Sequence, residues 1–399
     1  MAHTVPVSRR SMLVVVVAVS ALAACTGDDP SAEPSPAIAA TPSSTPTPTP
    51  EPRTFTLVGT GDVLLHERLW RQAEVDAAET GNGRLDFTPQ LANIAPIVSA
   101  ADLAICHLEV PLAPANGPYQ GYPTFSGPPQ VVSALDATGY DACSTASNHT
   151  FDQGAAGVTR TLDTLDAAGL AHAGSARTPA EAEQTTILDV DTAEGPVRVA
   201  LLSYAYGFNG IPYPNGKTFW ANEIDEQLIL TDAATARDRG AEVVVVAMHW
   251  GTEYDHKPNS QQAELAPQLI AAPDIDLLLG HHAHVVQPIE NVNGEWVVYG
   301  MGNLMANHAE PQGAKSEGLL TRFTFTENMS TGRFEATTAE YLPLYQTYEF
   351  PVEVLVVPVA LASGDTGTAG AARLEEALAR TTDVVTGRGN PAGLVLLTP

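Results

Sequence analysis

Basic residues are scarce in this sequence. Its 399 residues contain 19 Lys and Arg against 46 Asp and Glu, which gives a formal net charge of -27 at pH 7. A surface with this excess of negative charge repels the phosphates of nucleic acids and of anionic lipid headgroups. We therefore expect no nucleic-acid partner for this protein.

Long apolar runs are also missing, and no internal repeat suggests a solenoid or a propeller. The apolar run at residues 12–24 follows Arg9 and Arg10, and its length of about a dozen residues is too short for a comfortable membrane span. A short apolar run behind basic residues is typical of a cleaved export signal. The sequence therefore predicts a secreted protein without a retained membrane helix.

Cysteine is limited to three residues. The first, Cys25, ends the sequence Leu22-Ala23-Ala24-Cys25, which resembles the lipobox of bacterial lipoproteins. The resemblance implies that Cys25 is diacylated and becomes the first mature residue, so that the protein is anchored to the outer face of the cell membrane. The alternative is a soluble secreted protein that ordinary signal peptidase cleaves nearby.

The other two cysteines, Cys106 and Cys143, lie in apolar, strand-like stretches. A disulfide between them could form in an oxidising compartment. Buried free cysteines behave as small hydrophobic residues, and we favour two buried thiols over a disulfide.

The composition predicts four segments. Residues 1–25 are the lipoprotein signal peptide, and residues 26–53 form a disordered tether, because a Pro/Thr-rich stretch cannot bury a core. Residues 54–350 form one large domain. Residues 351–399 are a C-terminal extension whose pattern is not diagnostic.

Strand-like and helical segments alternate along the large domain. The β-branched run at residues 242–247 is continuous, as in a parallel strand that is buried on both faces. The runs at residues 296–299 and 319–325 are expected to be paired strands that close the sheet. This alternation predicts an α/β fold, in which ligands bind beyond the carboxyl ends of the strands.

Polar side chains recur just past the predicted strands of this domain. Carboxylate, amide and imidazole groups together suit divalent Mn, Fe or Zn. Six such ligands suffice for two metal ions. A pair of metal ions can activate a water and stabilise both the attacking and the leaving oxygen at phosphorus. The candidate ligands are Asp62, Glu109, Asn148, His249, His282 and His284.

Each candidate alone also has a structural explanation. Asp62 and Asn148 could cap the helices that follow them, Glu109 could be an ordinary loop carboxylate, and His249 could be a hydrogen-bonded core histidine. The three histidines at positions 281–284 are harder to explain, since they share one short loop after an apolar strand. We therefore predict metal or anion binding at this loop.

Six sequence blocks, in order, resemble the CapA capsule-synthesis family over roughly residues 54–305. The resemblance implies a role in the synthesis and export of poly-γ-glutamate capsule. It also implies the four-layer metallophosphatase-like sandwich of calcineurin-like phosphoesterases, in which two mixed sheets are flanked by helices. The blocks are Gly61-Asp62-Val63, Leu108-Glu109, Ser147-Asn148-His149, His249-Trp250-Gly251, Gly280-His281-His282-Ala283-His284 and Gly302-Asn303.

The same resemblance implies roles for individual residues. Asp62, Asn148, His249, His282 and His284 correspond to metal ligands and Glu109 to the carboxylate that bridges two metals. His149 corresponds to the histidine that stabilises or protonates the leaving oxygen. The residues expected to support these groups are His281, Asp152, Glu253 and Asn303.

The sequence departs from the wider superfamily at two ligand positions. Its first motif reads Asp62-Val63-Leu64 where Asp-x-His is usual, so one ligand is missing unless His66 substitutes. Glu109 stands where Asp is usual. Both departures leave open how many metals bind and whether the site is a phosphatase.

The leading hypothesis is a lipid-anchored, CapA-like protein that acts on or holds an anionic envelope polymer outside the cell, with a metal-assisted hydrolytic site. Two alternatives remain. One is a non-catalytic scaffold of the polymer synthesis and export complex. The other is an extracellular nucleotidase or phosphodiesterase.

Overall fold

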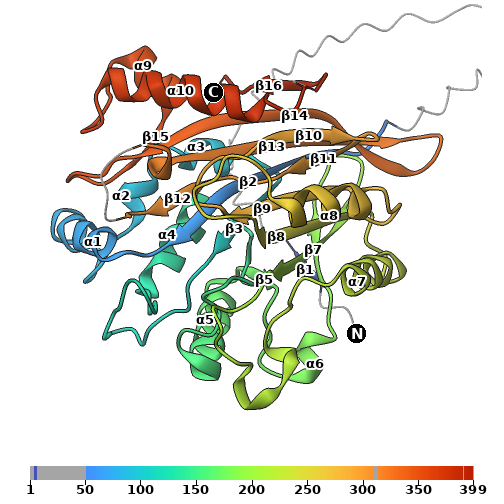
Figure 1. The fold of residues 1–399 in the computed structure, drawn as a ribbon, viewed down its shortest axis with the longest axis horizontal. Coiled ribbons are helices and arrows are strands. Elements are labelled where there is room, and N and C mark those ends of the chain that lie inside the picture. The colour runs from blue at the N-terminus through green and yellow to red at the C-terminus, as the bar shows by residue number, and fades with distance from the viewer. Residues whose placement is uncertain (1–3, 7–50, 309–312, 390, 399) are drawn as a thin grey trace, which may run out of the picture. The chain divides into compact units, whose positions relative to one another are not determined.

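Two mixed β-sheets lie at the centre of the structure (Figure 1). The computed structural model describes residues 4–6, 51–308, 313–389 and 391–398. The first sheet, sheet A, contains in spatial order β1 (Thr4–Pro6), β6 (Thr186–Val190), β7 (Val197–Ala205), β8 (Val243–Trp250), β9 (Leu277–His282), β11 (Glu295–Val298) and β10 (Ile289–Val292). Sheet B contains β15 (Val354–Val356), β14 (Arg333–Gln346), β13 (Glu317–Asn328), β2 (Thr54–Leu64), β3 (Leu103–Leu108), β4 (Ala142–Ser144) and β5 (Ala171–Ala173), with β12 (Asn303–Ala306) beside β2 and β16 (Leu394–Leu396) beside β14.

Helices cover the outer face of each sheet. Those whose apolar side chains pack on sheet B are α1 (Glu67–Thr80), α2 (Thr88–Leu91), α3 (Ala95–Val98), α4 (Gln130–Thr138) and α5 (Gly154–Ala168). Sheet A is covered by α7 (Glu226–Asp238) and α8 (Ser260–Ile270). A further short helix, α6 (Pro179–Ala182), precedes β6.

The alternation of side chains along the strands produces four layers. On β8, Val243 and Val245 pack between the two sheets, whereas Val244 and Val246 pack against α7 and α8. Successive strand residues face opposite sides of a sheet, so a strand buried on both faces must be apolar throughout. The predicted α/β fold with two mixed sheets flanked by helices is confirmed.

Parallel pairing brings the carboxyl ends of several strands to one rim. In sheet B, β2, β3, β4 and β5 run parallel, and in sheet A, β7, β8 and β9 run parallel. Residues that follow or end these strands therefore meet, although they are far apart in the sequence. This rim carries the site described below.

One expected strand pairing is wrong. The runs at residues 296–299 and 319–325 do form strands, but β11 pairs with β9 and β10 in sheet A, and β13 pairs with β2 and β14 in sheet B. Both runs are apolar because their sheets face each other, and an apolar pattern does not reveal to which of two facing sheets a strand belongs.

The C-terminal extension packs on the large domain. Helices α9 (Val357–Ser363) and α10 (Ala371–Val385) lie on β14 and β15, as Figure 1 shows. The guanidinium of Arg380 on α10 pairs with Glu317, whose carboxylate is 1% exposed, at the start of β13. This pair connects the extension to the first residue of β13.

The predicted leader, the anchor at Cys25 and nearly all of the tether lie outside the described residues. The exception within the leader is β1, which pairs in parallel with β6 at the edge of sheet A. Within the part of the chain that the structure describes, no helix has both the length and the apolar character needed to cross a membrane.

Cys106 and Cys143 form a disulfide, so the preference for two buried thiols is wrong. The parallel register of β3 and β4 places the two residues directly opposite each other, with Cα atoms 4.5 Å apart. This separation lies within the usual range for a disulfide. The sequence alone did not specify that register.

The disulfide yields a prediction about stability. It joins residues 37 positions apart, and closing such a loop restricts the unfolded chain. We expect Cys143→Ala to lower the free energy of unfolding by about 2–4 kcal/mol, measured by urea denaturation. Reductant should destabilise the wild type and leave the variant unchanged, and an equal response of both proteins would contradict the assignment.

Candidate metal centre

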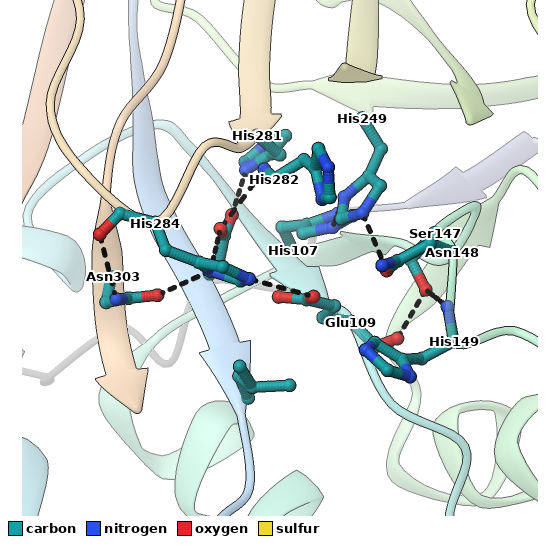
Figure 2. A network of polar contacts seen from close by, with 12 residues as sticks. His107, Glu109, Ser147, Asn148, His149, His249, His281, His282, His284 and Asn303 are labelled. Carbon is teal, nitrogen blue, oxygen red and sulfur yellow. Dashed lines mark hydrogen bonds and ion pairs between the residues drawn. The ribbon is translucent and has the colours of Figure 1, made fainter. Parts of the chain in front are cut away.

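The six predicted ligands gather at the rim where the parallel strands end, and Figure 2 labels Glu109, Asn148, His249, His282 and His284 among them. Asp62 and Glu109 come from sheet B and the loop after β3, and the histidines come from β8, β9 and the loop after β9. None of the six is more than 4% exposed. The structure thus brings together Asp62, Glu109, Asn148, His249, His282 and His284.

The carboxylate of Asp62 contacts three residues at the end of β9 and just after it. His281 Nδ1 lies 2.9 Å from Oδ1, the backbone N–H of His282 donates to Oδ2 at 3.2 Å, and His284 Nδ1 lies 3.3 Å from Oδ2. Burial alone would raise the pKa of Asp62, but the hydrogen bonds from His281 and His284 outweigh it and hold the pKa well below its usual value. Asp62 is therefore ionised.

Glu109 is buried without a hydrogen-bond partner for either carboxylate oxygen. Its nearest cationic neighbour is His284, whose Nε2 lies 3.7 Å from Oε1. Burial raises the pKa of Glu109 to about 7, although the charge of His284 opposes the shift. For His284, burial lowers the pKa, but Glu109 and Asp62 prevail and raise it to about 9.

A chain of hydrogen bonds connects Asn148 to the core of sheet B. His249 Nε2 lies 3.0 Å from Asn148 Oδ1, His249 Nδ1 lies 2.9 Å from His107 Nε2, and His107 Nδ1 lies 2.8 Å from Ser144 Oγ. Burial lowers the pKa of both histidines well below the usual value, so both rings are neutral. A neutral ring has one N–H and one acceptor nitrogen. Because Asn148 Oδ1 can only accept, His249 donates to it from Nε2, His107 donates from Nε2 to His249 Nδ1, and the Ser144 hydroxyl donates to His107 Nδ1.

The loop after β9 follows an unusual backbone path. His282 has φ 86° and His284 has φ 54°, values that non-glycine residues adopt rarely and that cluster at functional sites. A Cβ on Gly280 would lie 1.9 Å from the carbonyl oxygen of Tyr299. Only glycine therefore allows β9 to pass this close to the next strand and deliver both rings to the rim.

His149 is held beside the ligands by Asp152. Its Nδ1–H donates to Asp152 Oδ2 at 2.7 Å, and its ring meets Phe125 edge-on at 4.7 Å. Because Nδ1 is engaged, Nε2 is the nitrogen that can act on a bound ligand. Figure 2 shows Glu109 between His284 and His149.

The other supporting residues differ in their burial. Asn303 Oδ1 lies 3.1 Å from His284 Nδ1, and its amide donates to the backbone oxygens of His284 and Lys315. The ring of His281 lies against that of His107, with centroids 4.0 Å apart. Glu253 is exposed, yet its carboxylate lies within reach of His282 and His284.

His107 is a residue that the sequence interpretation missed. It is fully buried and contacts both His249 and His281. A spacing signal was present, since His107 precedes Glu109 by two positions and alternate strand residues share a face. Among the described residues, His66 belongs to none of the groups whose ligand atoms lie within 4.8 Å of one another, so the structure does not mark it as a replacement for the missing ligand.

The arrangement fits a divalent cation. Both oxygens of Glu109 and Nδ1 of His282 are buried and unpartnered, and a buried carboxylate without a partner is costly unless a cation compensates it. Three groups within the described residues bring their ligand atoms within 4.8 Å of one another: Asp62, His107 and His281; Asp62, Glu109 and His284; and Glu253, His282 and His284. A bound divalent ion would polarise a phosphoryl or carbonyl oxygen and lower the pKa of a water.

The fold and the site define a two-sheet α/β protein with a buried candidate metal centre of carboxylate, amide and imidazole groups at its strand ends. The chain belongs to the family described as bacterial capsule synthesis protein PGA_cap, whose model matches residues 56–308. The resemblance to the CapA family is thereby confirmed.

Three curated proteins are similar to this chain. The PGA biosynthesis protein CapA of Bacillus subtilis is 29% identical over 215 residues, which cover 52% of this chain and 53% of that protein. The capsule biosynthesis protein CapA of Bacillus anthracis is 28% identical over 44% of this chain and 42% of that protein. A probable polyglutamine synthesis accessory protein of Mycobacterium tuberculosis is 27% identical over 62% and 69%. The chain spans about half the length of the two Bacillus proteins.

Solved structures with a similar arrangement are more distant. The calcineurin-like phosphoesterase YfkN of Bacillus subtilis is 14% identical with a TM-score of 0.42, over 83% of this chain and 97% of that one. A 5'-nucleotidase precursor of Thermus thermophilus is 15% identical with a TM-score of 0.44, over 83% and 58%.

Glu109 yields a prediction about pH and metal. In the metal-free protein its pKa is about 7 against 4.5 for the free side chain, so its contribution to stability is fully present below pH 4.5 and is lost as the pH rises through 7. We expect metal-free Glu109→Gln to melt at a higher temperature than the wild type above pH 7.

Added Mn²⁺ should raise the melting temperature of the wild type more than that of the Glu109→Gln variant. Equal responses would contradict a cation site at Glu109.

His107 yields a second prediction. In His107→Phe, the ring keeps its contact with His281 but can no longer hydrogen-bond to His249. Loss of a residue that orients a ligand typically weakens metal binding by roughly 10- to 100-fold, and we expect a loss of this size in calorimetric titration with Mn²⁺. An unchanged dissociation constant in a variant with an unchanged melting temperature would show that His107 only fills space.

Proposed function

We propose that this protein is an accessory protein in the synthesis or export of a capsule polymer of the poly-γ-glutamate type, with a metal-dependent, phosphoesterase-like hydrolytic centre. The names of its relatives associate them with capsule, PGA or polyglutamine synthesis. The centre would act on a phosphoester or a related anionic linkage of the envelope polymer or its precursor.

The observation that carries this proposal is the buried, unpartnered carboxylate of Glu109 among imidazole rings. A protein that only holds a polymer gains nothing from such a group, because burying an unpaired carboxylate costs stability. A hydrolytic metal centre needs it, since a carboxylate is the ligand that compensates the charge of two neighbouring cations. The six converging side chains would hold one or two such ions of Mn, Fe or Zn.

The protein's own residues divide the remaining work. Asp62 is fixed by His281, and His249 is fixed by His107, so the ligand geometry is set before a substrate arrives. His149, oriented by Asp152, would donate a proton from Nε2 to the departing oxygen. The near-complete burial of the ligands limits access of bulk water.

The proposed location is the outer face of the cell membrane, with a lipid anchor at Cys25. The lipobox-like sequence before Cys25 supports this location. The disulfide between Cys106 and Cys143 also supports it, because disulfides persist in oxidising compartments outside the cytosol.

One sequence feature favours a second candidate, a non-catalytic scaffold. Leu64 stands where the superfamily carries a histidine ligand, and a centre with fewer ligands could retain a metal for binding alone. The scaffold and the hydrolase make opposite predictions for one assay.

That assay measures hydrolysis of an aryl phosphodiester by the purified full chain with Mn²⁺. His284→Gly removes the imidazole, while glycine keeps the positive φ of that position. We expect the variant to lose about 100-fold or more of the activity. The matched control is His172→Ala on β5, where the ring bonds to Asp166 away from the centre. Equal background rates in all three proteins would reject the hydrolase and favour the scaffold.

A further inference from the structure

An exposed carboxylate lies on the solvent side of the centre. Glu253 belongs to the turn that follows β8. One of its oxygens lies within 4.8 Å of a ring nitrogen of His282 and of a ring nitrogen of His284, and these two nitrogens lie within the same distance of each other. The three side chains, called the outer group below, can therefore reach one common ion.

One hydrogen bond holds the two loops of the outer group together. The backbone N–H of Tyr254 donates to the carbonyl oxygen of Ala283 at 2.7 Å. Tyr254 follows Glu253 directly, and Ala283 separates His282 from His284. The bond therefore joins the immediate neighbours of all three side chains, so the backbone fixes the outer group although one of its members is exposed.

Both loops follow unusual backbone paths at this point. Gly251 has φ 102° and Tyr254 has φ 65° on either side of Glu253, and His282 and His284 also have positive φ. Residues with a side chain rarely adopt such values. They persist where the surrounding structure enforces them, and they cluster at sites that bind ligands. The turn after β8 thus shares this feature with the loop that carries the two histidines.

His282 has an unused nitrogen. Its Nδ1 is buried and has no hydrogen-bond partner among the described residues. The rings of Tyr206 and His249 pack against that of His282, with centroids 4.5 and 4.7 Å away, and this packing limits its rotation towards water. A buried polar atom without a partner costs stability. A cation would remove that cost, because the lone pair of an imidazole nitrogen is a metal ligand.

Two imidazoles and one carboxylate form a familiar ligand set. Such a set holds Zn²⁺ or Fe²⁺ in metalloenzymes and leaves coordination positions open. The outer group has this composition, and it reaches solvent through its carboxylate. A second group, called the inner group, is buried throughout and has two carboxylates and one imidazole: Asp62, Glu109 and His284. The two groups share His284, so two cation positions would be neighbours.

We propose that Glu253, His282 and His284 form a separate position for a divalent cation, on the solvent side of the inner position at Glu109. The inference rests on the metal centre of the proposed function, to which it adds Glu253 as a direct ligand. The outer cation would have open positions towards solvent, where a water or an anionic oxygen of a substrate could bind. Glu253 would supply the negative charge that this cation needs, because both histidines are neutral as ligands.

The test is calorimetric titration of the metal-free full chain with Mn²⁺. We expect two binding events in the wild type. Glu253→Gln should weaken one of them by at least about 10- to 100-fold, because even the loss of a residue that only orients a ligand has an effect of this size. Glu109→Gln should weaken the other event. Glu253→Asp, which keeps the charge but shortens the side chain by one methylene, should lie between the wild type and Glu253→Gln.

The matched control is Glu264→Gln on α8. Glu264 is exposed like Glu253, but among the described residues it belongs to no group of converging ligand atoms. The control removes the same charge and should bind Mn²⁺ like the wild type. Equal weakening in both variants would reduce the effect to long-range charge and overturn the proposal.

Three other results would overturn the outer position. Glu253→Gln could bind Mn²⁺ like the wild type, or Glu253→Gln and Glu109→Gln could weaken one and the same event. Metal-free Glu253→Gln should also melt at the temperature of the wild type, because substitutions of exposed side chains change stability little. A large drop without metal would instead assign Glu253 a structural role.

Binding is measured without turnover, so this inference and the proposed function can fail separately. If no protein hydrolyses the aryl phosphodiester but Glu253→Gln still loses one cation, the outer position stands and the hydrolase is rejected. If the wild type hydrolyses the phosphodiester and Glu253→Gln retains both cations, only the outer position is rejected.

Discussion

The structure depends on one buried carboxylate that joins the two sheets. Asp62 belongs to β2 of sheet B, yet its oxygens bind His281, His282 and His284 at the end of β9 in sheet A. An ionised carboxylate that is 0% exposed needs all these donors. The contact therefore holds the rims of the two sheets together at the centre.

Around this contact the centre has an uneven distribution of charge. His107 and His249 are neutral, and their hydrogen bonds link Ser144 to Asn148. These two residues therefore contribute oriented dipoles to the centre. Glu109 has no hydrogen-bond partner for either carboxylate oxygen among the described residues, and His284 Nε2 lies 3.7 Å from its Oε1. If His249 binds a cation through Nε2, its proton must lie on Nδ1 and be donated to His107. The bound cation would then determine the direction of each hydrogen bond from His249 to Ser144.

The sequence predicted the α/β fold and the strand-end residues because strands such as β8 and β9 are apolar runs that end in polar residues. It did not reveal that Cys106 faces Cys143, nor that β11 and β13 lie in different sheets, since register and sheet membership depend on contacts between distant segments. His107 was missed for a related reason. A histidine inside an apolar strand looks like core until the structure shows what it contacts.

The ion pair between Arg380 and Glu317 has a practical consequence for dissecting the molecule. A truncated version that stops before α9 would expose the apolar surface of β14. It would also leave the buried Glu317 without its counterion Arg380. That carboxylate lies two residues after Lys315, whose carbonyl oxygen accepts a hydrogen bond from Asn303. The smallest autonomous piece must therefore retain α10, although no proposed ligand lies in that helix.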